Sequence, residues 1–286
     1  GLKSWATQLY VLSRRRSPVP QHRGMLRVLV AALALCSAAA SRPRPSGLRW
    51  QTQENEQPLL FIAVVTGPKN RDRREDVRNG WMKHPMLTGD NPKIVARFML
   101  GHTDEDPQLA EELQQHSAEF VRLPMAESYE NLRAKTIELF KWAVSADAPR
   151  AKFIMKLDDD TYPNFEKLVK YLDLHARRPN TYLGRISRNY PTPHNGRWGE
   201  PGWHRDHLPT YALGSGYVLS ADLARAVAQQ HAGQAEHSPL RSEDTTMGWL
   251  VELAAGGKAN YVGVPATVYG CGQADVLSMQ LGVGKL

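Results

Sequence analysis

Residues 153–160 read Phe-Ile-Met-Lys-Leu-Asp-Asp-Asp, an apolar stretch that ends in three consecutive acidic residues. The first five residues have the character of a short β-strand that is buried on both faces. Three adjacent carboxylates repel one another, whereas Mg²⁺ and Mn²⁺ prefer oxygen ligands of this kind. The pattern therefore predicts a strand that carries carboxylates to the edge of a sheet, with a solvated acidic turn as the alternative.

The segments around this stretch alternate between strand-like and helix-like patterns. Apolar runs predict strands, and a helical repeat of apolar residues or an Asp-Pro start predicts helices. The predicted strands are 59–65, 94–100, 153–157 and 181–186, and the predicted helices are 70–81, 106–117, 129–145 and 164–177. This alternation predicts an α/β fold with a doubly wound, mostly parallel sheet and helices on both faces, whose ligands bind at the carboxyl ends of the strands.

The basic charge of the chain is concentrated at its N-terminal end. Of the 36 Lys and Arg and 29 Asp and Glu residues, residues 1–57 hold nine basic and two acidic ones, so 27 of each sign remain in residues 58–286. A nucleic-acid-binding domain carries its positive charge on the folded surface, so this distribution argues against a nucleic-acid partner. With two cysteines, Cys36 and Cys271, the sequence has no paired spacing for a structural zinc site.

Residues 25–41 have the pattern of a signal peptide or a short signal-anchor. Arg27 precedes an apolar run of 13 residues that ends in three alanines at position 40. A helix needs about 20 apolar residues to cross a bilayer, and a buried Ala/Leu helix is the alternative. We expect a basic extension over 1–24, the membrane-directed segment over 25–41, a linker over 42–57 and one folded domain over 58–286.

Residues 153–164, Phe-Ile-Met-Lys-Leu-Asp-Asp-Asp-Thr-Tyr-Pro-Asn, resemble a signature of the β-1,3-galactosyltransferase family, and three further blocks agree with that family in order and spacing. They are a strand with an arginine-rich helix (62–81), a helix that begins Glu-Ser-Tyr-Glu-Asn-Leu-Arg-Ala-Lys-Thr at Glu127, and a glycine-containing stretch (208–223) followed by Ser-Glu-Asp-Thr-Thr-Met-Gly (242–248). One family position differs, because Arg133 stands where the family has Thr. The resemblance covers about residues 59–272.

The resemblance implies a single catalytic domain with a GT-A fold, a UDP-sugar donor, Mn²⁺ and inversion at the anomeric carbon. It makes Asp160 the first candidate metal ligand and Asp158 the second, and it makes Asp244 the candidate base that takes the proton of the acceptor hydroxyl. The implied donor-binding residues are Arg74, Arg78, Lys135, Asp158, Asp159, Gly214 and Gly216. The implied acceptor-binding residues are Trp198 and Glu243.

Each of these candidates also has a structural interpretation. Arg74 and Arg78 lie one helical turn apart and could instead pair with acidic residues on a solvated face. Glu243 and Asp244 follow Ser242, a plausible N-cap, and could instead stabilise a helix through capping and through their interaction with the helix dipole. The two glycines could form a plain tight turn in a loop. The remaining alternatives are that Lys135 and Lys156 are structural and that Trp198 and Trp203 belong to the core.

The resemblance leads us to expect a Mn²⁺-dependent, inverting galactosyltransferase that acts in the Golgi membrane, with UDP-galactose as donor and a terminal sugar of a glycan on protein as acceptor. A galactose of a proteoglycan linker is the first acceptor candidate. A sister enzyme that uses UDP-N-acetylglucosamine is one alternative. A non-catalytic glycan-binding protein is another, because the family usually brings a C-terminal His to the metal and this sequence has none after His237.

Overall fold

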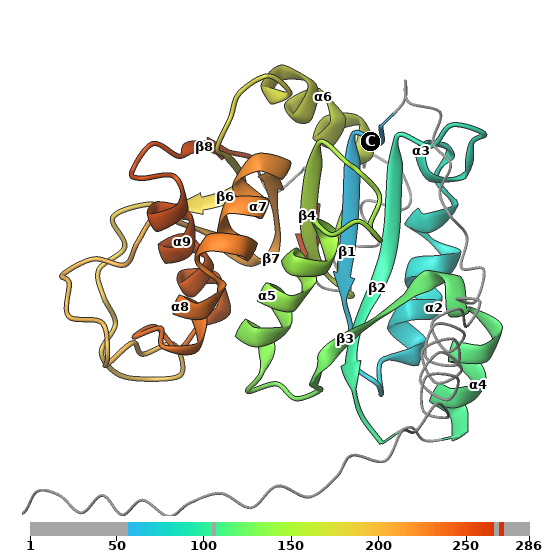
Figure 1. Ribbon diagram of the computed structural model, residues 1–286, viewed down its shortest axis with the longest axis horizontal. Helices are drawn as coiled ribbons and strands as arrows, with labels where there is room; N and C mark the ends of the chain where they lie inside the picture. Colours follow the sequence, from blue (N-terminus) through green and yellow to red (C-terminus); the bar gives the residue numbers. More distant parts are fainter. Residues whose placement is uncertain (1–56, 105–106, 266–268, 272–286) are drawn as a thin grey trace, which may run out of the picture. The chain divides into compact units, whose positions relative to one another are not determined.

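The computed structural model describes residues 57–104, 107–265 and 269–271, which form a central sheet with helices around it (Figure 1). The described strands of the central sheet are β1 (Leu60–Val65), β2 (Ile94–His102), β3 (Phe120–Ala126), β4 (Phe153–Asp158), β6 (Thr181–Ser187), β7 (Tyr211–Ser220) and β8 (Asn260–Gly263). Their spatial order is β3-β2-β1-β4-β7-β6-β8. A separate pair joins β5 (Thr161–Pro163) to β9 (Tyr269–Cys271) in antiparallel fashion.

The strands of the central sheet run in one direction except for β7. β1 pairs in parallel with β2 and β4, β2 with β3, and β6 with β8, whereas β7 is antiparallel to both β4 and β6. Parallel neighbours need crossover connections, which the helices between them supply. The predicted mostly parallel α/β sheet is therefore confirmed.

Helices cover both faces of this sheet, as its alternating side chains require. Phe61 and Ala63 of β1 pack in one core cluster with α5, α7 and α9, whereas Leu60 and Ile62 pack in a second cluster with α2, η2 and α6. The described helices are α2 (Arg71–Asn79), η2 (Trp81–Lys83), α3 (Pro85–Thr88), α4 (Pro107–Gln115), η3 (Ser117–Glu119), α5 (Leu132–Ala143), α6 (Phe165–His175), α7 (Ala221–Gln230), α8 (Ala232–Glu236) and α9 (Glu243–Ala254).

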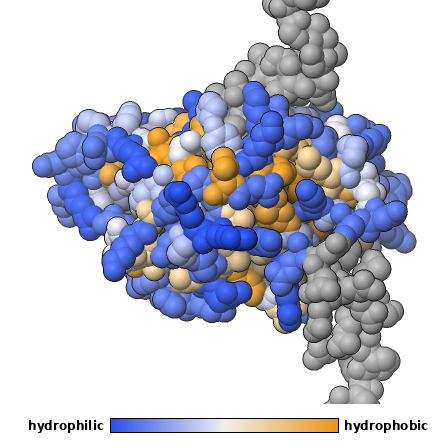
Figure 2. Space-filling model, turned by 90° about the horizontal axis from the view of Figure 1, so that it is seen from above, coloured by the Kyte–Doolittle hydropathy of each residue, from blue (hydrophilic) through white to orange (hydrophobic). Residues whose placement is uncertain are grey.

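The carboxyl edge of the sheet is the edge toward which the arrow of β1 points in Figure 1. Figure 2 shows the molecule from above in the orientation of Figure 1, at the amino edge of the sheet, where the surface is mainly hydrophilic and apolar side chains are exposed near the centre. The candidate residues Asp158–Asp160 directly follow β4, which is parallel to β1. They therefore lie at the carboxyl edge, away from the face that Figure 2 shows.

The N-terminal predictions fall almost entirely outside the described residues. The expected extension over 1–24, the membrane-directed segment over 25–41 and the linker over 42–57 precede the described part of the chain, apart from its first residue, Gln57. The helices that the structure does describe are too short or too polar for any of them to cross a membrane.

Candidate functional site

The end of β4 brings three carboxylates next to the end of β1. Val65 pairs with Asp158 in the parallel ladder, so the loop after β1 lies beside Asp159 and Asp160. A position where parallel strands end and loops diverge is the usual ligand site of an open α/β sheet. The three carboxylates, however, have three different environments.

Asp159 fastens the loop between β1 and α2. Its side chain is buried, and its Oδ2 accepts hydrogen bonds from Thr66 Oγ1 and Asn70 Nδ2, both at 2.7 Å. Its Oδ1 lies 3.0 Å from Nη1 of Arg73. Both oxygens of Asp159, predicted to contact the donor, are thus engaged within the protein.

Asp160 is the most accessible of the three carboxylates. Its side chain is 43% exposed, and Nη1 of Arg73 lies 3.2 Å from its Oδ2. Arg73 is itself half exposed and bridges Asp159 to Asp160. Arg73 was not among the predicted donor-binding residues, although its neighbour Arg74 was.

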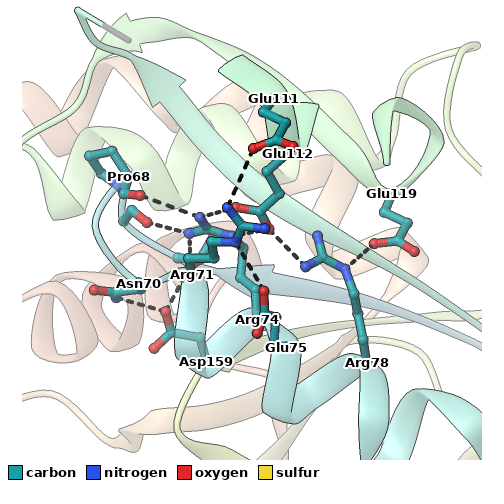
Figure 3. A network of polar contacts seen from close by, with 12 residues as sticks. Pro68, Asn70, Arg71, Arg74, Glu75, Arg78, Glu111, Glu112, Glu119 and Asp159 are labelled. Atoms are coloured by element: carbon teal, nitrogen blue, oxygen red, sulfur yellow. Dashed lines mark hydrogen bonds and ion pairs between the residues drawn. The ribbon is translucent and has the colours of Figure 1, made fainter. Parts of the chain in front are cut away.

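Arg74 and Arg78 point to the other side of α2, where they share Glu112 of α4 (Figure 3). The guanidinium of Arg74 is fully buried, donates to both oxygens of Glu112 at 2.9 and 2.6 Å, and donates to the carbonyl of Gly67 at 2.6 Å. Arg78 reaches Glu112 at 2.7 Å and Glu119 at 2.5 Å. Burial would raise the pKa of Glu112, but the two arginines outweigh it and lower the pKa.

This network corrects the expected placement of Arg74 and Arg78. Neither guanidinium faces the carboxylates after β4, and the partner of both is Glu112, which the sequence analysis had not considered. Because Arg74 also donates to the carbonyls of Gly67 and Pro68, the network holds the loop after β1 in place. The contacts of Arg74 therefore reach the candidate site through that loop.

Lys135 of α5 supports the same loop from the opposite face of the sheet. It is buried, and its Nζ donates to the carbonyl of Thr66 at 2.6 Å and to both oxygens of Glu127 at 2.7 Å. Burial lowers the pKa of Lys135, and the charge of Glu127 opposes this shift. These contacts agree with the structural interpretation of Lys135.

A second group of charges lies where β4 meets β7 and α9. Nζ of the buried Lys156 lies 2.6 Å from Oδ1 of Asp158 and 3.7 Å from Oε2 of Glu243, and it also donates to the carbonyl of Gly214. Burial alone would lower the pKa of Lys156, but Glu243 and Asp158 raise it instead. Desolvation raises the pKa of Asp158 to about 6, against the effect of Lys156. The hydroxyl of Tyr217 donates to Glu243 at 2.6 Å.

Glu243 was predicted to bind the acceptor, but the structure gives it partners within the protein. Its side chain is buried between the hydroxyl of Tyr217 and the ammonium of Lys156. A carboxylate with both oxygens facing buried donors is not open to a sugar hydroxyl. Its negative charge nevertheless acts on its neighbour, Asp244.

Asp244 lies in the first turn of α9, directly against β7. A Cβ built on Gly214 would lie 3.6 Å from Oδ2 of Asp244, and the backbone N–H of Thr245 donates to Oδ1 at 2.9 Å. Desolvation and then the charge of Glu243 raise the pKa of Asp244 to about 6, against the backbone donors and Lys156. The residue is half-buried. Asp244 is therefore a carboxylate of raised basicity that still reaches the surface of the site.

Gly214 and Gly216 lie inside strand β7 and not in the loop that the sequence predicted. Neither has a positive φ. In the ladder between β7 and β6, Tyr217 pairs with Gly184 and Ala212 pairs with Ile186. Residues 213–216 of β7 therefore lie opposite a single residue of β6 and form a bulge. A Cβ on Gly216 would lie 2.9 Å from Cδ1 of Leu157, so a larger residue there would require Leu157 to shift. The bulge lies where β7 faces Asp244.

In the long connection between β6 and β7, one tryptophan is exposed and the other is buried. Trp198 is exposed, and the guanidinium carbon of Arg197 lies 4.8 Å from the centre of its ring. Trp203 is buried against Trp249, and its Nε1 donates to the carbonyl of His207 at 2.9 Å. The structural alternative thus holds for Trp203, whereas Trp198 remains available to a ligand.

The described residues do not gather three metal-ligating side chains at one point. Asp158 and Asp160 are two residues apart, and Asp158 is already paired with Lys156. The C-terminal part of the chain, in which the family brings a histidine to the metal, lies outside the described residues beyond Cys271. The described part of the chain therefore offers Asp160 and Asp158 as candidate ligands.

Comparison with known proteins identifies the class of enzyme to which this fold and site belong. The sequence model of the galactosyltransferase family matches residues 72–255, which include three arginines of α2 (Arg73, Arg74 and Arg78), the carboxylates after β4 and the Glu-Asp pair of α9. The protein is therefore a glycosyltransferase. The chain belongs to the galactosyltransferase family, and its relatives include several β-1,3-galactosyltransferases.

Three relatives show the range of this similarity. The chain is 31% identical to β-1,3-galactosyltransferase 6 of Mus musculus over 77% of this chain and 68% of the mouse protein. It is 29% identical to hydroxyproline O-galactosyltransferase GALT5 of Arabidopsis thaliana over 79% of this chain, but the match spans 34% of the plant protein. It is 31% identical to lactosylceramide 1,3-N-acetyl-β-D-glucosaminyltransferase A of Xenopus laevis over 68% of this chain and 54% of the frog protein.

Among solved structures, the mannosyltransferase PcManGT of Pyrobaculum calidifontis, in complex with GDP-Man and Mn²⁺, resembles the chain at a TM-score of 0.43 and 10% identity. The likeness covers 85% of this chain and 64% of that protein. It is too weak to carry an argument about the site.

Proposed function

We propose that this chain is an inverting β-1,3-galactosyltransferase that moves galactose from UDP-galactose to the 3-hydroxyl of a terminal sugar, with Asp244 as its base. The observation that carries the proposal is the environment of Asp244, a half-buried carboxylate with a pKa of about 6 beside the bulge of β7. A base whose pKa lies near the working pH is both deprotonated and basic enough to take a proton.

In the proposed step, Asp244 takes the proton of the acceptor hydroxyl. The hydroxyl oxygen forms the new bond to the anomeric carbon while the bond from that carbon to the UDP oxygen breaks. Because attack and departure occur on opposite faces of the sugar, the configuration at the anomeric carbon inverts. Glu243 and Lys156 take no proton in this step; they set the charge around Asp244.

Mn²⁺ fits the residues at the end of β4. A divalent cation of this kind is commonly held by one or two carboxylates together with substrate phosphates, so three protein ligands are not required. Asp160 would hold it, because its carboxylate is the most accessible of the three, with Asp158 as the second candidate. When bound, the ion supplies positive charge that stabilises the departing diphosphate.

Arg73 is the arginine of α2 that we place near the donor. Its guanidinium is half exposed and already touches Asp159 and Asp160, whereas Arg74 and Arg78 are turned toward Glu112. An arginine fork suits a diphosphate well, because two of its N–H groups can bind phosphate oxygens together. The exposed ring of Trp198 is the corresponding candidate for stacking on an acceptor sugar.

The proposal extends to the acceptor and the compartment. The acceptor is a terminal galactose of a proteoglycan linker or of a related glycan on protein, which the motifs shared with the β-1,3-galactosyltransferase family support. The enzyme works in the lumen of the Golgi, attached or delivered through residues 25–41, which the signal-like pattern of Arg27 and the apolar run supports.

The test of donor and metal is UDP release by the full chain with a galactosyl-β1,4-xyloside as acceptor. We expect UDP-galactose to react faster than UDP-N-acetylglucosamine and UDP-N-acetylgalactosamine, and we expect EDTA to remove the activity until Mn²⁺ is added back. A faster reaction with another donor would contradict the galactose assignment. Release that is insensitive to EDTA would contradict the role of the metal.

The pH dependence of kcat/KM for the full chain should show a single acidic limb. Since the base must be deprotonated, kcat/KM should fall at least tenfold per pH unit below the pKa of Asp244, about 6, and more steeply where Asp158, whose pKa is also about 6, is protonated as well. Glu243→Gln should move this limb to lower pH, because the negative charge of Glu243 helps to raise the pKa of Asp244. A limb that stays in place or moves to higher pH in this variant would contradict the coupling of the two carboxylates.

A further inference from the structure

Glu200, in the long connection between β6 and β7, is a fully buried carboxylate that serves the start of α9. Its Oε1 accepts hydrogen bonds from the backbone N–H of Ser242 at 2.9 Å and from Thr245 Oγ1 at 3.1 Å. Its Oε2 accepts one from the backbone N–H of Arg241. None of the ion pairs among the described residues includes Glu200, so its described partners are these hydrogen-bond donors.

These hydrogen bonds hold the residues that lead into α9. Ser242 occupies the N-cap position, as the sequence predicted, but its side chain makes no capping hydrogen bond. The free N–H groups before a helix attract negative charge, and hydrogen bonds to an ionised acceptor are stronger than neutral ones. Glu200 therefore binds the backbone N–H groups of the two residues just before α9 and the hydroxyl of Thr245 in its first turn.

The segment that leads into α9 is held on its other side as well. Arg133 of α5 donates to the carbonyl of Leu240 at 2.7 Å, and Ser238 Oγ contacts Thr246 Oγ1 at 3.2 Å. Arg133 is the residue that departs from the family pattern in α5, and this contact gives it a structural use. With Leu240 fully buried, Glu200 and Arg133 fix a short segment whose end lies two residues before Asp244.

The body of α9 leaves Asp244 little freedom to adjust. A Cβ on Gly248 would lie 2.6 Å from Cβ of Tyr211, so the helix packs against β7 at the closest approach that glycine permits. Glu200 reaches the first turn through the hydroxyl of Thr245, and it holds the N-cap residue through the N–H of Ser242. A shift of about 1 Å in a reacting group can cost about a hundredfold in rate.

We propose that Glu200 is a positioning residue: it fixes the first turn of α9, and hence the carboxylate of Asp244, and it joins this turn to the loop that carries Trp198. The proposal rests on the proposed function, because it matters for catalysis only if Asp244 is the base. Glu200 acts through backbone N–H groups and Thr245, and it takes no part in proton transfer. The loop that carries Trp198 and the first turn that carries Asp244 are thereby held in one fixed arrangement.

The test compares Glu200→Gln with Glu252→Gln, a matched change of a half-buried glutamate of α9 that pairs with exposed Arg205 at 3.1 Å. In Glu200→Gln we expect hydrogen exchange of the amides of Arg241 and Ser242 to become roughly 10- to 100-fold faster. We expect kcat to fall by a similar factor, while KM for the donor stays within about twofold. Glu252→Gln should change none of these quantities.

A second pair of variants keeps the charge and changes one donor. Thr245→Val removes the hydroxyl that donates a hydrogen bond to Oε1 of Glu200, whereas Thr245→Ser retains a hydroxyl at this position. We expect Thr245→Val to lower kcat in the same direction as Glu200→Gln, though by less, and Thr245→Ser to restore it. Both keep the buried carboxylate paired with the backbone, so both should fold even if Glu200→Gln does not.

Hydrogen exchange separates a failure of this inference from a failure of the proposed function. Unchanged exchange at Arg241 and Ser242 in Glu200→Gln overturns the positioning role whether or not the chain is active. Faster exchange with an unchanged kcat overturns its importance for catalysis. A wild-type chain that transfers no sugar contradicts the proposed function, while the exchange data still decide whether Glu200 holds the first turn of α9.

Discussion

Replacing Arg74 by Met should lower the free energy of unfolding by about 3–5 kcal/mol, the usual result of removing one partner of a buried ion pair. The side chain of Arg74 is fully buried, and its guanidinium donates to both oxygens of Glu112, which is buried as well. Methionine retains much of the apolar volume, but it leaves Glu112 with Arg78 as its remaining partner and leaves the carbonyls of Gly67 and Pro68 without this donor. Chemical denaturation of both proteins measures the difference.

Two further variants show whether burial and pairing cause this loss. Arg71→Met, one turn earlier in α2, removes an exposed pair with Glu75 and should leave the unfolding free energy near that of the wild type. Arg74→Met combined with Glu112→Met removes both charges and should lose less stability than Arg74→Met alone. If Arg74→Met instead keeps full stability and raises KM for UDP-galactose, the donor-binding role predicted from the sequence is correct.

The parts of the fold that sequence reasoning predicted are those with an uninterrupted pattern. β1, β2, β4 and α6 lie within two residues of their predicted bounds, because buried parallel strands are continuous apolar runs and amphipathic helices repeat every 3.6 residues. β3 was missed because it is an edge strand whose sequence contains Arg122 and Pro124. β7 was missed because Gly214 and Gly216 interrupt its apolar run.

The candidate site was predicted where its residues are neighbours in sequence and not where they meet through the fold. Three carboxylates after one strand could be read directly from the chain. Whether Arg73 or Arg74 faces them depends on the rotation of α2, since adjacent residues of a helix point about 100° apart. The contacts of Glu200 with α9 and of Arg74 with Glu112 join residues 42 and 38 positions apart, and no local spacing indicates such pairs.

Replacing Asp244 by Asn should lower kcat by about a thousandfold, within the range that general base catalysis contributes. Asparagine has nearly the same shape, and its Oδ1 can still accept the hydrogen bond from the N–H of Thr245 at the start of α9. The amide cannot take a proton from an acceptor hydroxyl. Folding and donor binding should therefore survive the substitution, and the loss should fall on the transfer step.

Asp72→Asn is the matched control for this variant. Asp72 also lies in the first turn of a helix, α2, but its side chain is exposed, and the residue is distant in sequence from Glu243 and Asp244. We expect Asp72→Asn to keep the wild-type kcat. A comparable loss in both variants would mean that charge at helix starts, and not a base at Asp244, limits the rate.

The most direct measurement is kcat for UDP release by the wild-type chain, Asp244→Asn and Asp72→Asn, with Mn²⁺, UDP-galactose and the same galactosyl acceptor. We expect wild type and Asp72→Asn to agree, and Asp244→Asn to retain about a thousandth of the activity with an unchanged affinity for UDP. If Asp244→Asn keeps more than about a tenth of the wild-type kcat, a contribution too small for a general base, Asp244 is not the base of this enzyme.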